Sequence, residues 1–191
     1  MPIRRPIAAP LREALIECFA ATTRLVRPSL RRQLYTEDLD VAAPPEALQD
    51  IWGGVMDGTL NFKLESDGKI RFNAPQGFQV KLDLLELGAD PINRIHATEL
   101  FLDGSVASMS DLLLLRAVTV VDRGSKGDLL DFDWLLSKVV EIGNFPKIDN
   151  EEFEVLVEAV ETRLGRLGRL LVAAFIGSIN TAAAERLIIV S

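Results

Sequence analysis

Apolar residues recur at helical spacing near the start of the chain and alternate with polar residues in its middle. Over residues 11–26 the apolar side chains return about every four positions, which predicts a helix. A second helix is predicted over residues 44–55, because a proline pair stands at its start, where a missing N–H is tolerated. Gly53 and Gly54 are predicted to end this helix.

Alternation of apolar and polar residues predicts short strands in the middle of the chain, over residues 38–42, 60–64, 70–73, 78–87 and 97–104. Asp67 and Gly68 are a strong two-residue turn signal, so the second and third of these strands are predicted to form a hairpin. In the fourth strand Lys81 and Asp83 alternate with apolar residues. Asp83 is therefore expected on the face that points away from the core.

From Ser108 onward every pattern is helical, with helices predicted over residues 108–123, 127–143, 149–177 and 180–190. Ser108 is a candidate cap for the first of these helices, and Gly143 is placed to end the second. The order of elements predicts an α+β fold, with an α/β part over residues 1–105 and a helical part over residues 106–191 that together form one compact unit.

Composition narrows the classes of function. The 191 residues are 48% hydrophobic, enough for a core, and the net charge of −7 offers no broad basic face for nucleic acid. A single cysteine excludes a disulfide framework, and a lone histidine, His96, argues against a Ser-His-Asp triad or a histidine metal cluster. The role of His96 stays open.

No membrane or export signal stands out. Charged residues interrupt the apolar run near the N-terminus, so it does not read as a secretory signal. The apolar run over residues 170–179 is much shorter than the ~20 residues of a spanning helix. We therefore expect a soluble, cytoplasmic protein with no nucleic-acid or membrane partner; its oligomeric state is not indicated.

Three aspartates are the strongest chemical signal. Asp38 and Asp40 alternate on a predicted strand, so their side chains point to one face, and Asp83 lies on another strand. Three carboxylates from neighbouring strands suit a hard cation such as magnesium, and two such ions can clamp a phosphoryl transfer. Aspartates at strand ends also commonly cap turns or face water, which is the plainer interpretation of these residues.

Three segments resemble the nucleotidyltransferase superfamily, which includes polymerase beta, aminoglycoside adenylyltransferases and the toxins of bacterial abortive-infection systems. "YTEDLDVAA" resembles the family's Arg-x-Thr-x-Asp-h-Asp-h-h-h strand, where h is apolar, and "GFQVKLDLLELG" resembles the strand that carries the third carboxylate. "SMSDLLLLRAVTVVDRGSKGDLLDFDWLL" resembles the first bundle helices of the toxin-like branch, with Arg116 in a lysine position, followed by Arg123, Lys126, Asp128 and Asp131. The resemblance covers roughly Tyr35 to Leu136.

The chain departs from this family at the phosphate cradle. Active members carry a glycine pair ten to fourteen residues before the Asp-x-Asp, whereas "TTRLVRPSLRRQLY" contains no glycine. Without backbone N–H groups free to approach a triphosphate, the site should hold one poorly. Arg27, Arg31 and Arg32 are an alternative source of phosphate contacts or a solvated basic turn.

The leading hypothesis is a degenerate nucleotidyltransferase fold that no longer transfers nucleotides. Its cleft would bind and transform a small, largely apolar metabolite, as in a cofactor-independent cyclase of specialised biosynthesis. Catalytic candidates are Asp38, Asp40 and Asp83, and substrate-binding candidates are Tyr35, Thr36, Lys81, Arg116, Arg123 and Lys126.

Two alternatives stay open. In an active transferase of the toxin or antibiotic-modifying type, Asp38 and Asp40 would hold Mg²⁺, Asp83 would help to activate the acceptor hydroxyl, and Arg123 or Lys126 would hold a nucleoside triphosphate. In a non-catalytic partner protein the same acids would be surface groups.

Overall fold

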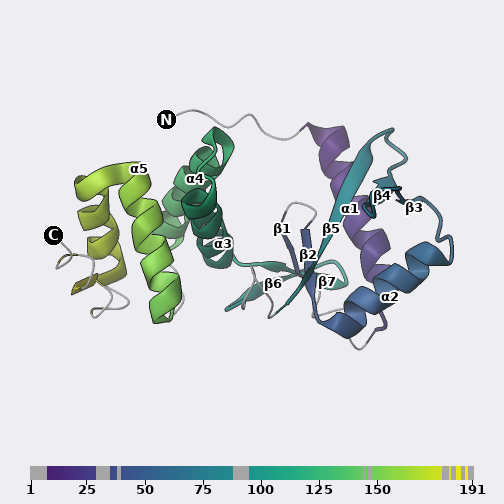
Figure 1. Cartoon of the computed structure of the whole chain (residues 1–191), viewed down its shortest axis with the longest axis horizontal. Helices are drawn as coiled ribbons and strands as arrows, with labels where there is room; N and C mark the ends of the chain where they lie inside the picture. Colours follow the sequence, from purple (N-terminus) through teal and green to yellow (C-terminus); the bar gives the residue numbers. More distant parts are fainter. Residues whose placement is uncertain are drawn as a thin grey trace. The chain divides into compact units, whose positions relative to one another are not determined.

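The computed structural model describes residues 8–28, 35–37, 40–87, 95–143, 145, 148–177, 181, 184–185 and 188, with only the backbone described at 35–37 and at a few positions of the last helix. The chain forms two compact units, Met1–Ala107 (unit 1) and Ser108–Ser191 (unit 2). Unit 1 mixes helices with strands and the helices described in unit 2 follow, so the predicted α+β class is confirmed (Figure 1). The helix predicted over residues 180–190 falls largely outside the described residues.

Unit 1 combines helices with two small sheets. Its elements in chain order are α1 (Ala9–Leu25), β1 (Tyr35–Glu37), β2 (Asp40–Ala43), α2 (Pro45–Met56), β3 (Phe62–Leu64), β4 (Ile70–Asn73), β5 (Gln79–Glu86), β6 (Thr98–Phe101) and β7 (Gly104–Ala107). Five strands form a mixed sheet in the order β1-β2-β5-β4-β3, in which β2 and β5 are parallel neighbours and the other pairs are antiparallel. β6 and β7 form a separate two-stranded sheet.

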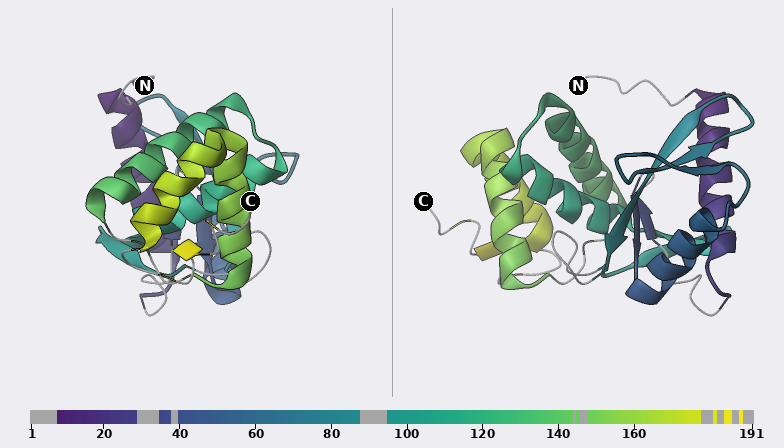
Figure 2. Two further views of the ribbon diagram at one scale, coloured as in Figure 1. Left: turned by 90° about the vertical axis from the view of Figure 1, so that its left-hand side faces the viewer. Right: turned by 45° about the vertical axis from the view of Figure 1, so that its right-hand side comes forward.

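One face of the five-stranded sheet carries the core of unit 1. Successive strand residues point to opposite faces, and the buried set comes from alternate positions of β2, β4 and β5. These side chains pack against α1 and α2, which lie on the same side of the sheet in Figure 2 (right). The sheet residues of this core are Val41, Ala43, Ile70, Phe72, Val80 and Leu82. The opposite face of the sheet carries Lys81 and Asp83, as predicted from the alternation.

The second helix is longer than predicted. α2 begins at Pro45 and continues through the glycine pair to Met56, so the expectation that Gly53 and Gly54 end it is wrong. Packing explains the difference, because a Cβ on Gly54 would stand 2.7 Å from the Leu25 side chain, where α1 approaches. The chain turns only after the helix, at Gly58, whose φ is +79°.

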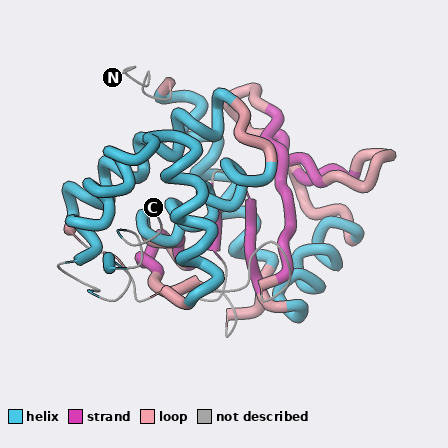
Figure 3. Tube along the Cα trace, turned by 60° about the vertical axis from the view of Figure 1, so that its left-hand side comes forward, coloured by secondary structure: helices cyan, strands magenta, loops and turns pink. Residues whose placement is uncertain are grey.

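Two hairpins complete unit 1 (Figure 3, strands in magenta and turns in pink). The predicted hairpin is confirmed as β3 and β4, joined by a turn in which Gly68 has a φ of +81°. The strand predicted over residues 97–104 is β6 followed by a tight turn, and its partner β7 was not predicted. Leu102, in that turn, adopts a φ of +51° although it is not glycine.

Unit 2 contains α3 (Met109–Asp122), α4 (Lys126–Ile142) and α5 (Asn150–Gly177), as Figure 1 shows in green to yellow. The Ser108 hydroxyl accepts a hydrogen bond from the Asp111 N–H and caps α3, and Gly143, with a φ of +71°, ends α4; both predictions are confirmed. The three helices share one apolar core, to which each contributes buried residues such as Leu113, Phe132 and Leu156.

α5 is not the single straight helix that the apolar pattern predicts. Gly165 has φ +61° and ψ −164°, which is not a helical conformation, and the helix bends there. The second part of α5 folds back beside the first, as Figures 1 and 2 show.

Candidate functional site

The structure pairs two of the predicted catalytic acids across neighbouring strands of unit 1. Asp40 is the first residue of β2, and its register partner on the parallel strand β5 is Asp83. Register partners point to the same face, and neighbouring strands lie about 4.8 Å apart, so both carboxylates rise from adjacent points of the sheet. Both residues are half-buried on the face opposite α1 and α2. We call this pair the acidic row.

A lysine is already bound to the acidic row. The Nζ of Lys81 contacts the Oδ2 of Asp83, two residues further along the same face of β5. The two side chains are 44% and 39% exposed, so water and ligands reach the pair. The ammonium group partly neutralises Asp83, which lowers the negative charge that the row can offer to a metal ion.

Rows of different chemistry flank the acidic row. On one side, Ala42 of β2 and Leu85 of β5 are register partners, with Ala42 buried and Leu85 half-buried. On the other side, Arg71 of β4 pairs with Lys81 of β5, and Arg71 also lies beside Lys63 of β3. The side of the sheet opposite α1 and α2 therefore passes from apolar through acidic to basic within a few residues.

Three predicted site residues near the acidic row are only partly visible. Asp38 lies outside the described residues, and for Tyr35 and Thr36 only the backbone in β1 is described, paired with Ala42 and Val41. Within the part of the chain that the structure describes, no group of three acidic, histidine or cysteine side chains gathers where it could hold one metal ion. A magnesium site on this sheet would thus depend on Asp38.

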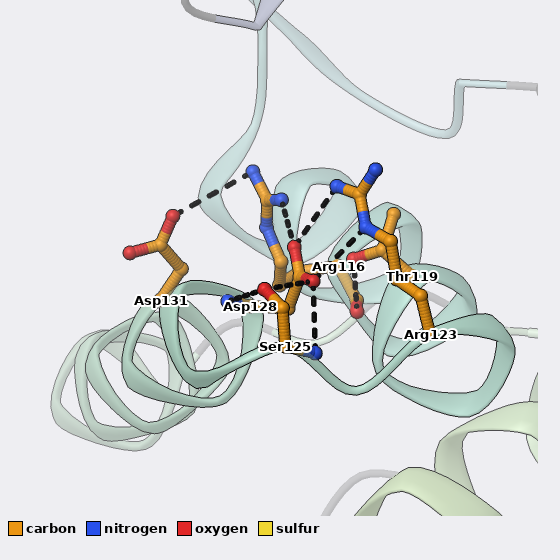
Figure 4. A network of polar contacts seen from close by, with 6 residues as sticks. All are labelled: Arg116, Thr119, Arg123, Ser125, Asp128 and Asp131. Atoms are coloured by element: carbon orange, nitrogen blue, oxygen red, sulfur yellow. Dashed lines mark hydrogen bonds and ion pairs between the residues drawn. The ribbon is translucent and has the colours of Figure 1, made fainter.

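The remaining predicted site residues belong to unit 2, where Arg116 and Arg123 both contact Asp128 (Figure 4). Arg123 donates from Nε and Nη2 to the Asp128 carboxylate at 2.9 and 3.0 Å, and Arg116 donates from Nη1 at 3.2 Å. Asp131 lies 3.8 Å from the Arg116 guanidinium. Lys126, the first residue of α4, is exposed.

Asp128 also caps its own helix. The Ser125 hydroxyl accepts the Asp128 N–H at 3.3 Å and the Ser125 backbone N–H donates to the Asp128 carboxylate at 3.2 Å, which makes a capping box. The Ser125 hydroxyl also donates to this carboxylate at 2.6 Å. Hydrogen bonds from the Arg123 guanidinium and the Ser125 hydroxyl hold the pKa of this carboxyl well below its usual range. The Asp128 side chain is only 5% exposed, so the cluster fastens α3 to α4 at the start of α4.

Arg116 and Arg123, predicted from the sequence as substrate contacts, have a structural role in this cluster. The guanidinium groups of Arg116 and Arg123 both bind Asp128, and the Arg116 side chain is only 13% exposed. A part for either arginine or for Lys126 in substrate binding stays a prediction. The Ser-x-x-Asp spacing of Ser125 and Asp128 is the sequence signal from which the capping box could have been foreseen.

Comparison of the chain with protein-family models, with curated proteins and with solved structures finds no match. The resemblance to nucleotidyltransferases therefore rests on the sequence motifs alone. None of the helices that the structure describes combines the length and the apolar character needed to cross a bilayer.

Proposed function

We propose that unit 1 is a nucleotidyltransferase-like domain that has lost nucleotide transfer and binds a small, largely apolar molecule on the sheet face opposite α1 and α2. The observation that carries the proposal is the register of Asp40 with Asp83, which sets two acids between an apolar row and a basic row. A ligand lying across these rows would meet the half-buried Leu85 with its apolar body. Its polar end would meet Asp83 and Lys81.

The loss of nucleotide transfer is supported by the condition of the groups that would bind a triphosphate. The glycine pair is missing from the sequence before the acids. Lys81 contacts Asp83, and this contact would have to be given up before a metal–triphosphate complex could use the Asp83 carboxylate.

Cyclisation of one metabolite is the reaction class that this arrangement supports best. A ring closure within one molecule rearranges its own bonds and consumes no second substrate or cofactor. The protein contributes by holding the reactive ends near each other, while an ammonium group such as that of Lys81 polarises a carbonyl. The acids would orient the substrate through hydrogen bonds from its hydroxyl groups.

An active magnesium-dependent nucleotidyltransferase is the second candidate, and the same register of Asp40 with Asp83 favours it. Asp38 and Asp40 would hold the metal, and Asp83 would help to activate the acceptor hydroxyl. This requires Lys81 to leave Asp83, since a metal ion and an ammonium group compete for the same oxygens. A non-catalytic binding protein is the third candidate.

Thermal shift measurements separate the candidates. The wild-type protein, Asp40→Asn, Asp83→Asn and the control Glu86→Gln would be heated with Mg²⁺ and each nucleoside triphosphate, and separately with a panel of apolar ketones and carboxylic acids. Glu86 is the control because it lies on the same strand but alternates to the opposite face. We expect shifts with apolar compounds that Asp40→Asn or Asp83→Asn abolishes and Glu86→Gln retains.

Other results point elsewhere. A Mg²⁺-dependent shift with a triphosphate, lost in Asp40→Asn, would replace the proposal by the transferase. Absence of any shift in both arms would leave the non-catalytic protein.

A further inference from the structure

The bend in α5 occurs at a conformation that glycine alone adopts readily. Gly165 has φ +61° and ψ −164°, in the region of backbone space that is essentially restricted to glycine. It lies inside a segment of 28 residues, Asn150–Gly177, that is otherwise helical, so a change of conformation at this one residue would make α5 continuous. This inference concerns unit 2 alone and does not depend on the function proposed for unit 1.

A second glycine, Gly168, provides independent evidence that the sequence is adapted to the bent form of α5. A Cβ on Gly168 would stand 1.9 Å from the Cβ of Leu164, which no packing tolerates. In a straight helix, residues four apart lie one turn above each other with room for both side chains. Gly168 is therefore required when α5 is bent and unnecessary when it is straight.

An ion pair closes the bend. Arg169 is 8% exposed and donates from Nη1 to the Oε1 of Glu161. In a continuous helix, residues eight apart are separated by about 12 Å along the axis, so this contact would be lost. Glu161 and Arg169 thus act as a latch that exists only while α5 is folded back.

The segment after the bend supplies part of the core of unit 2. Val172, Ala173 and Ile176 are at most 4% exposed and belong to the same apolar cluster as Phe153 and Val160, which precede the bend. If α5 straightened, the apolar surfaces on both sides of the bend would be exposed together. The matching surface for residues 166–177 is the groove that the same segment vacates in a second copy of the chain.

We propose that α5 opens at Gly165 and exchanges the chain from residue 166 onward with a second copy, which gives a domain-swapped dimer joined by two continuous helices. Each copy regains its core contacts from its partner, and Glu161 regains an arginine from the other chain. Only the hinge differs between the closed monomer and the swapped dimer, and a one-residue hinge is the kind of short connection that invites swapping.

The test uses single substitutions that favour the straight form of α5 over the bent form. Gly165→Ala and Gly168→Ala each favour the straight helix, whereas Gly143→Ala strains a positive-φ glycine outside α5 and is the matched control. Size-exclusion chromatography with light scattering would measure the oligomeric state, and circular dichroism the helix content. We expect Gly165→Ala to raise the dimer fraction at least tenfold over wild type at equal concentration, and Gly143→Ala to leave it unchanged.

Cross-linking distinguishes a swap from ordinary association. Glu161→Cys with Arg169→Cys, in a Cys18→Ala background that also carries Gly165→Ala, would be treated with a short bismaleimide. The proposal requires the link to join two chains in the dimer and to stay within one chain when Gly165 is retained. The proposal is overturned if the link in the dimer joins two residues of one chain. It is also overturned if Gly165→Ala and Gly168→Ala both fold and both remain monomeric. If Gly165→Ala fails to fold, Gly168→Ala carries the same test.

Discussion

Asp40 and Asp83 are register partners on adjacent parallel strands, although a helix and a hairpin separate them in the chain. Parallel neighbours require such an intervening crossover, so the pairing is a property of the fold and not of local sequence. The pair lies on the face opposite α1 and α2, where Lys81 also contacts Asp83.

The acidic row should contribute little to stability. Asp83→Asn removes the contact with Lys81, but both side chains are more than a third exposed, so we expect a loss of at most about 1 kcal/mol. Urea denaturation would measure it, with Glu141→Gln, which removes the exposed Lys138 pair, as a comparison. A loss of several kcal/mol would instead mark Asp83 as a structural residue and undercut its use as a probe of binding.

Asp128 should behave in the opposite way. Asp128→Ala leaves the nearly buried Arg116 without that carboxylate and removes the reciprocal cap from α4, so a loss of about 3–5 kcal/mol is expected. Asp133→Ala is the control on the same helix, because its pair with Arg163 is more exposed and should be worth about 1 kcal/mol or less. Equal losses in the two variants, measured by urea denaturation, would contradict the role of Asp128 in fastening α3 to α4.

The stability of unit 2 should also depend on pH. The pKa of Asp128 is lower in the folded protein than the usual value of about 3.9, so its ionised form stabilises the fold above that pH. This contribution is lost as the pH falls from the unfolded value toward the folded one. Urea midpoints between pH 2 and pH 7 should therefore fall more steeply for the wild type than for Asp128→Asn. Parallel curves would show that another group governs the acid response.

Sequence patterns correctly predicted those features of the fold that depend on residues close to each other in the chain. The alternation that places Lys81 and Asp83 on the outer face, the Gly68 turn and the Gly143 helix end all follow from residues within a few positions of each other. Gly54 shows the limit of this reasoning, because contact with Leu25 of another helix, and not a turn, explains that glycine.

The parts that could not be predicted depend on contacts between distant elements. The apolar period of α5 runs through Gly165 without a break, so only packing of its second part against the first explains the bend. Arg116 and Arg123 read as possible ligand contacts because the sequence does not show that Asp128 meets both of them. The pairing of Asp40 with Asp83 was anticipated only through the family resemblance.

Cys18 should be unreactive in the folded protein. It is fully buried beneath the sheet, and burial raises the pKa of its thiol to about 12. Because the thiolate is the reactive form, Ellman's reagent at pH 8 should label Cys18 only after unfolding. Labelling in urea should follow the unfolding curve. Rapid labelling without denaturant would show that α1 separates from the sheet in the native state.

Replacing Leu102 by glycine should stabilise the protein. Leu102 sits between β6 and β7 with a φ of +51°, which strains a residue that has a Cβ, and its side chain is 52% exposed, so little burial is lost on removing it. The relief of strain, less the added freedom of glycine in the unfolded chain, should amount to roughly 0.5–1 kcal/mol. Leu100→Gly is the matched control, since Leu100 is also exposed but occupies the strand itself, where glycine should destabilise. Thermal and urea unfolding of both variants would measure the effects, and the two substitutions should move the midpoints in opposite directions. Destabilisation by Leu102→Gly would mean that this leucine makes contacts that outweigh the strain of its backbone.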